Sequence, residues 1–190
     1  ETVSFTIAIA FLFGIMTAYL SASEVILEDV YDYGTWFPLF FGVVAVLLMV
    51  NSLNNARLVE RLGLDTLIRR TVLVGLVTVT VLLVVSFTGG GTPVFWVWGV
   101  AIALVVPVAQ GLVPNCNTAA MTPLPHVAGT ASTIIATVTT AGGALLGGLA
   151  ADSFDGTTRP LAVFVAAYMF IAAALILAGP GRSRRRRPSD

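Results

Sequence analysis

Long stretches without a charged side chain constrain this sequence most. Four of them have about the length of one membrane-spanning helix, which needs ~20 predominantly apolar residues; they are residues 2–23, 33–56, 127–151 and 160–181. A fifth stretch, residues 71–125, is long enough for two helices and contains Gly89-Gly90-Gly91-Thr92-Pro93, a sequence that favours a turn. We therefore predict six spans, at about 3–22, 36–54, 71–88, 94–113, 127–151 and 160–178.

The composition agrees with a membrane protein and excludes two other classes. The chain has 190 residues, of which 57% are hydrophobic and 11% are charged. Soluble domains carry about 25% charged residues, and disordered chains are poor in apolar ones. Runs such as 71–87 and 161–177 do not alternate between apolar and polar residues as β-barrel strands do. The expected fold class is an all-α membrane protein with six transmembrane helices.

The distribution of arginine predicts the orientation in the membrane. Nine of the ten basic residues, all arginines, fall between the second and third spans or after the sixth; Arg159 is the exception. The positive-inside rule places these segments and both termini in the cytoplasm. The basic tail at 182–190 has two interpretations, a nucleic-acid patch or an anchor that also attracts anionic lipid. We favour the anchor because it completes the topology, and we expect no nucleic-acid partner.

Two features of the chain bear on its extent and on cofactors. The sequence begins with Glu1 rather than Met, so we expect it to be a piece of a longer protein. Its first apolar run lacks a basic region before it and is interpreted as a span rather than a signal peptide.

The single cysteine, Cys116, allows no internal disulfide and no cysteine metal cluster. We expect neither a metal nor a cofactor.

The first span has one weakly polar face, and the third and sixth spans have none. The third and sixth are the most uniformly apolar, so we expect them to face lipid and the other four to face protein or water. Helical periodicity groups six residues of the first span: Thr6, Ala10, Phe13, Thr17, Ser21 and Glu24. This face is either a wall of a solute cavity, with Glu24 attracting cations, or a helix contact that ends in an interfacial acid.

The fourth span is the most irregular one. One face carries Trp96, Val100, Ala103, Pro107, Gln110, Pro114 and Asn117. The two prolines favour a kink, and a kinked helix at membrane depth often borders a cavity. Gln110, Asn115 and Asn117 therefore either line a cavity or form hydrogen bonds that hold the helices together.

The fifth span combines a threonine stripe with glycines. Thr130, Thr133, Thr137 and Thr140 share a face, and Gly143 and Gly147 have the GxxxG spacing that lets helices approach closely. We assign the glycines to packing and leave the role of the threonines open. In polarity, spans one to three resemble spans four to six in order. Two sets of three spans with opposite orientation are typical of the inverted repeats of secondary transporters.

Three stretches of the sequence resemble a known family. They are residues 19–23 (YLSAS) with Val30-Tyr31; Phe41-Gly42 with residues 51–63 (NSLNNARLVERLG); and residues 113–115 (VPN) with 125–132 (PHVAGTAS). These stretches resemble the second half of major facilitator superfamily transporters. The closest likeness is to the drug:proton antiporter branch typified by bicyclomycin- and chloramphenicol-resistance exporters.

The resemblance implies that the chain is the C-terminal six-helix half of a bacterial inner-membrane exporter. Its partners would be an N-terminal six-helix half, protons, the bilayer and an amphipathic drug-like solute. The solute would move by alternating access between the two halves. The expected cavity residues are Phe13, Thr17, Tyr19, Glu24, Trp96, Gln110, Asn115, Asn117, Thr133 and Thr137.

The segment between the second and third spans resembles the superfamily's cytoplasmic signature. Glu60, Arg61 and Gly63 match it and would form a gate loop, whereas Leu64 and Asp65 replace later basic positions. A positive-inside loop with a glycine turn is the alternative. Glu24 also departs from the family, which tends to have proline there. No acidic residue falls at mid-membrane, so proton coupling follows only from the resemblance.

Two further classes of protein are alternatives to a transporter for this sequence. A six-span accessory or scaffold protein without transport activity is the alternative to a transporter. A membrane serine hydrolase needs a nucleophile within hydrogen-bond reach of a base. The one histidine, His126, lies at the edge of a span, and Ser132 falls on a different helical face. We therefore expect no enzyme.

Overall fold

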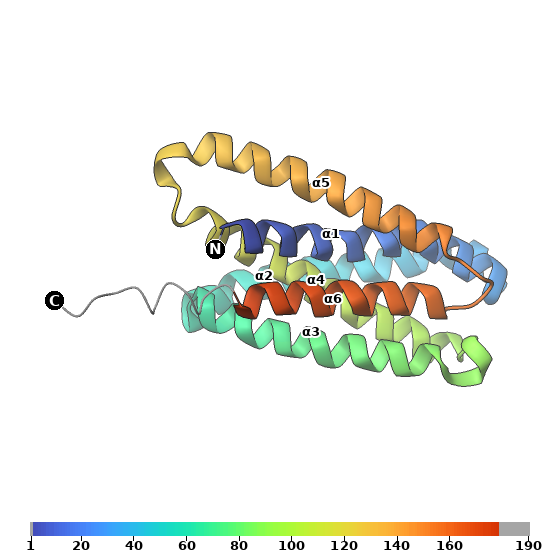
Figure 1. Cartoon of the computed structure of the whole chain (residues 1–190). Helices are drawn as coiled ribbons and strands as arrows, with labels where there is room; N and C mark the ends of the chain where they lie inside the picture. The colour runs from blue at the N-terminus through green and yellow to red at the C-terminus, as the bar shows by residue number, and fades with distance from the viewer. Residues whose placement is uncertain (1, 179–190) are drawn as a thin grey trace.

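The structure is a computed structural model that describes residues 2–178, and it is a bundle of six long helices (Figure 1). The helices are α1 (Thr2–Val25), α2 (Phe37–Leu62), α3 (Leu64–Ser86), α4 (Phe95–Met121), α5 (Ala128–Asp152) and α6 (Arg159–Ala178). All six are long and apolar enough to cross a membrane. The predicted all-α membrane fold is therefore confirmed, and the basic tail at 182–190 lies outside the described residues.

The bundle has two chemically different ends. The arginine end holds the α2–α3 turn with Arg57, Arg61, Arg69 and Arg70, together with the start of α1 (Figure 1). The acidic end holds the segment after α1, with Glu28, Asp29 and Asp32, and the α3–α4 and α5–α6 connections.

The connections are short, and glycine makes two of them possible. Gly89 and Gly90 have φ values of 57° and 74°, in the left-handed region that glycine tolerates best. They divide α3 from α4 at the predicted turn. Gly63, with φ 77°, is the single residue between α2 and α3. Residues 54–62, which the sequence led us to expect in a loop, continue helix α2 instead.

The pattern of major helix–helix contacts stays the same when α1, α2 and α3 are replaced by α4, α5 and α6, and the reverse. α1 packs against α5 and α6, and α4 packs correspondingly against α2 and α3. The two remaining major contacts, α1 with α4 and α3 with α6, are unchanged by the exchange. This pattern has the form expected of a 3+3 repeat. It places α1 and α4 at the centre, with α2 and α5 on opposite flanks.

Helices α2 and α6 differ in how much of each is buried, and the expectation that α3 and α6 face lipid stays a prediction. Half of the apolar window of α6 is buried against α1 and α3, whereas only 6% of the apolar window of α2 is buried. The reason is side-chain size, because alanines recur on the buried face of α6 and let it approach its neighbours. They are Ala162, Ala166, Ala172 and Ala173. The larger Val163 and Phe170 point outward.

Candidate solute-binding surface

Glycines hold α5 close to α1 from the middle of the bundle toward the acidic end. A Cβ on Gly142 would lie 3.2 Å from the Ala10 Cβ, and Gly143 lies against the Phe13 side chain. The Thr17 hydroxyl donates to the Gly143 carbonyl at 2.6 Å. The predicted packing role of the GxxxG glycines agrees with these contacts. Phe13 and Thr17, expected in a solute cavity, are partly buried in this contact.

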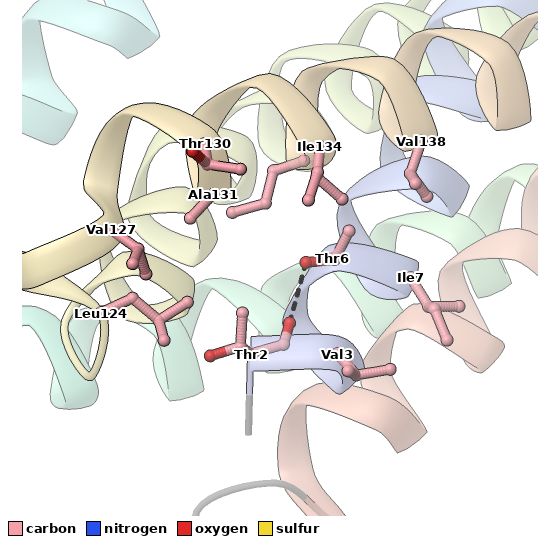
Figure 2. A pocket seen from close by; sticks show the side chains of 11 residues that line it. Thr2, Val3, Thr6, Ile7, Leu124, Val127, Thr130, Ala131, Ile134 and Val138 are labelled. Atoms are coloured by element: carbon pink, nitrogen blue, oxygen red, sulfur yellow. Dashed lines mark hydrogen bonds between the residues drawn. The ribbon is translucent and has the colours of Figure 1, made fainter.

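Toward the arginine end, α5 diverges from α1 (Figure 1). The two helices line an apolar groove of about 560 Å³ there, and Figure 2 shows the side chains around it. The groove is lined by Thr2, Val3, Thr6, Ile7, Leu124, Val127, Thr130, Ala131, Ile134, Ile135 and Val138. The Thr2 hydroxyl donates to the Ala120 carbonyl at 3.0 Å, and the Thr6 hydroxyl donates to the Thr2 carbonyl at 2.9 Å. These hydrogen bonds occupy the hydroxyls of Thr2 and Thr6, and Thr130 is the remaining polar side chain among apolar ones, so the groove suits an apolar group better than a polar one.

The threonine stripe of α5 is largely separate from this groove. Thr133 and Thr137 are exposed, and their hydroxyls donate within their own helix, to the Gly129 and Thr133 carbonyls at 3.1 and 2.9 Å. Ile134 and Val138, one position further along, line the groove instead. Both threonines therefore lie on an open flank of the bundle.

An amide cluster joins α2 to α4 toward the arginine end. The side chains of Asn55 and Asn115 donate to each other at 3.2 and 2.8 Å, and Asn115 is 3% exposed. Asn51 donates to the Pro107 carbonyl at 2.7 Å. Gly111 leaves room for Asn51, because a Cβ there would lie 2.6 Å from the Asn51 amide nitrogen. Asn51 and Asn55 were not predicted as site residues, although their spacing of four residues puts them on one face.

The remaining polar residues of α4 have different surroundings. Gln110 is partly buried and donates to the Leu12 carbonyl at 3.0 Å, which ties α4 to α1. Asn117 is exposed. The helix is continuous through Pro107 and Pro114, and the kink predicted at these prolines stays a prediction. Hydrogen bonding between helices thus accounts for Gln110 and Asn115.

Aromatic side chains fill the acidic end between α2, α4 and the segment after α1. Trp98 is fully buried, and its ring centroid lies 5.6 Å from that of Tyr31 and 6.1 Å from that of Phe40. Phe95 lies 5.3 Å from Tyr31 by the same measure. Burial raises the pKa of Tyr31 to about 12, so this phenol stays protonated at neutral pH. The sequence did not predict the cluster, because its members are spread over almost seventy positions.

The other expected cavity residues lie near this aromatic cluster or at its rim. Tyr19 is fully buried, and its ring stacks with that of Phe41 on α2 at a centroid distance of 6.4 Å. Trp96 is 73% exposed at the start of α4, and Glu24 is exposed near the end of α1. The expected cavity residues are therefore spread over several surfaces and do not converge on one pocket.

The expected gate residues lie at the arginine end. Glu60 and Arg61 are exposed on the last turn of α2, immediately before Gly63. Among residues 2–178, no group of three or more His, Cys, Asp or Glu side chains is arranged to hold a metal ion.

Fold and apolar surface define the class of this protein, an integral membrane protein with six helices that can each cross a bilayer. A comparison with curated proteins finds that the chain is similar to the bicyclomycin resistance protein homolog of Haemophilus influenzae. The two are 25% identical over 173 residues, which cover 90% of this chain and 43% of the relative. The chain thus spans less than half the length of this relative. No family model matches the chain, and no solved structure matches it.

Proposed function

We propose that this chain is the C-terminal half of a proton-coupled exporter that moves amphipathic drug-like molecules by alternating access. The observation that carries the proposal is the similarity to a bicyclomycin resistance protein homolog over 90% of this chain. Resistance to a drug is a property that export from the cell supplies. An N-terminal six-helix half would account for much of the remaining length of such a relative.

The architecture supports a transporter over an accessory or scaffold protein. Two three-helix repeats with equivalent contacts are typical of secondary transporters. Large apolar side chains cover the exposed surface of the flanking helix α2, among them Leu39, Val46 and Leu53. In the proposed exporter, α2 and α5 lie next to the N-terminal half, which would cover these surfaces.

The chemistry of the surfaces supports an amphipathic solute. The groove between α1 and α5 offers apolar walls for the hydrocarbon part of a molecule. Glu24 and the other acids give the opposite end of the bundle a negative field that attracts cations. In the proposed topology the arginine end and both termini are cytoplasmic, and Glu60, Arg61 and Gly63 belong to the inner gate.

The proposal is tested with the protein at its natural length, purified and reconstituted into vesicles. Ethidium, a fluorescent amphipathic cation, serves as the solute, and a proton gradient is imposed across the membrane. We expect ethidium to move against its own gradient only while the proton gradient exists. Ethidium movement that is the same with and without the gradient would exclude proton-coupled export.

A further inference from the structure

We infer that the amide pair formed by Asn55 and Asn115 is a releasable clasp, which positions the arginine end of α2 against α4 and opens during the cycle of the protein. The geometry of the clasp comes from this chain alone, and its place in a transport cycle rests on the proposed function. Asn51, bonded to the Pro107 carbonyl, belongs to the same contact.

The amide cluster supplies the side-chain hydrogen bonds that join this part of α2 to α4. Of the described residues of α2, Val44 is the one that is fully buried. Its aromatic contacts with α4, such as Phe40 with Trp98, lie near the acidic end. About four helical turns separate Phe40 from Asn55. At the other end, α2 is joined to α3 through Gly63, and the amide cluster is its hydrogen-bonded contact with α4.

The chemistry of the pair allows it to open at small cost. Both partners are uncharged amides, and each can exchange the other for water without leaving an ionised group behind. Neutral hydrogen bonds between membrane helices are weak on average. A salt bridge or a buried ionised group would not separate as readily.

The pair has the reciprocal geometry that a positioning contact requires. Each amide donates once to its partner, at 3.2 and 2.8 Å, so both side chains are oriented by the same contact. Asn115 also donates to the Gly111 carbonyl of its own helix at 3.0 Å. This additional bond keeps Asn115 fixed on α4 when α2 moves away, so the clasp can close again in the same register.

Spin labels across the α2–α4 contact test the clasp directly. Labels are placed at Leu58→Cys and Thr118→Cys in a Cys116→Ala background, because both positions are exposed one turn beyond the pair. Spin–spin distances are measured on the reconstituted protein of natural length. We expect a major short-distance and a minor long-distance population. Asn55→Ala and Asn115→Ala should each raise the ratio of long to short about three- to tenfold.

Three controls separate a clasp from a general loss of structure. The double variant should raise the ratio of long to short distances no more than either single variant does, because the same contact is lost in each case. The ratio of long to short distances in Asn55→Asp should be closer to that of the parent than the ratio in Asn55→Ala is. The reason is that a carboxylate still accepts the 2.8 Å hydrogen bond from Asn115. Asn54→Ala, a change at an exposed neighbour, should leave the distances unchanged.

Two results would overturn the inference. One is a single short-distance population that the asparagine variants do not alter, and the other is a double variant whose effect is the sum of the two single ones. The distances are measured without solute, so they decide on the clasp even if ethidium transport fails. Addition of ethidium to the labelled protein then shows whether opening belongs to transport; an unchanged ratio beside active ethidium flux would refute that link.

Discussion

The contacts of α5 with α1 and of α2 with α4 occupy equivalent places in the bundle but are built from different chemistry. Along α1, Gly142, Gly143 and Gly147 bring α5 into close contact with the facing helix. Along α4, helix α2 is held by aromatic rings at the acidic end and by amides toward the arginine end. Glycine packing depends on a close approach of two helix backbones, whereas each partner of an amide pair can also hydrogen-bond to water.

This difference indicates a division of labour between the two flanks. The α1–α5 contact is close from its middle to the acidic end and opens into an apolar groove at the arginine end. The α2–α4 contact consists of aromatic rings at one end and amides at the other, and it leaves most of the apolar window of α2 exposed. We therefore expect the first contact to set the stability of the bundle and the second to set its motion.

The largest effect is expected where a side chain is forced between α1 and α5. A Cβ on Gly147 would lie 2.9 Å from the Thr17 carbonyl carbon, which is backbone and cannot turn away. Gly147→Leu should therefore lower the free energy of unfolding by about 3 kcal/mol or more. Thermal or denaturant unfolding in detergent measures it.

Gly148→Leu is the matched control. Among the described residues nothing lies within 4 Å of a Cβ at Gly148, so this variant should unfold within about 1 kcal/mol of the parent. Equal losses in the two variants would contradict glycine packing as the basis of the α1–α5 contact.

A smaller effect is expected from the amide cluster. Asn115→Leu leaves the Asn55 amide without its partner, which should cost about 1–3 kcal/mol. The double variant Asn55→Leu/Asn115→Leu removes both polar groups and should recover most of that loss. The free energy of unfolding is measured for both variants. Asn117→Leu, a change at an exposed position, is the control. A double variant that loses the sum of the two single ones would show that the side chains are not coupled.

The smallest effect is expected from one hydroxyl. Thr17→Val keeps the side-chain shape but removes the 2.6 Å bond to the Gly143 carbonyl, which should cost about 0.5–1.5 kcal/mol. Thr137→Val removes a hydroxyl that bonds only within its own exposed turn and should change stability by a few tenths, about the error of the measurement. If the two variants behave alike, the hydroxyl of Thr17 adds nothing to the α1–α5 contact.

The sequence predicted the parts of this fold that depend on one segment at a time. The charge-free stretches predicted six helices, the glycine run predicted the α3–α4 turn, and the spacing of Gly143 and Gly147 predicted close packing. Each prediction rests on local chemistry, the need for about 20 apolar residues or for small residues at a helix contact.

The partners of the polar side chains could not be predicted in the same way. Polarity indicates that Asn115 and Gln110 need a hydrogen-bond partner, but not that Asn55 and the Leu12 carbonyl supply it. Hydropathy also does not indicate which face of α6 is buried, because it treats alanine and phenylalanine alike although they pack differently. Contacts between distant segments decide both cases, and a single sequence does not specify them.

The most direct test of the account compares solute flux after each flank is fixed by a covalent bond. In a Cys116→Ala background, Ala10→Cys with Gly142→Cys links α1 to α5. Leu58→Cys with Thr118→Cys, joined by a short reducible thiol cross-linker, links α2 to α4. We predict that proton-driven ethidium flux continues with α1–α5 linked, stops with α2–α4 linked, and returns on reduction. Undiminished flux through the protein with α2–α4 linked would contradict the account.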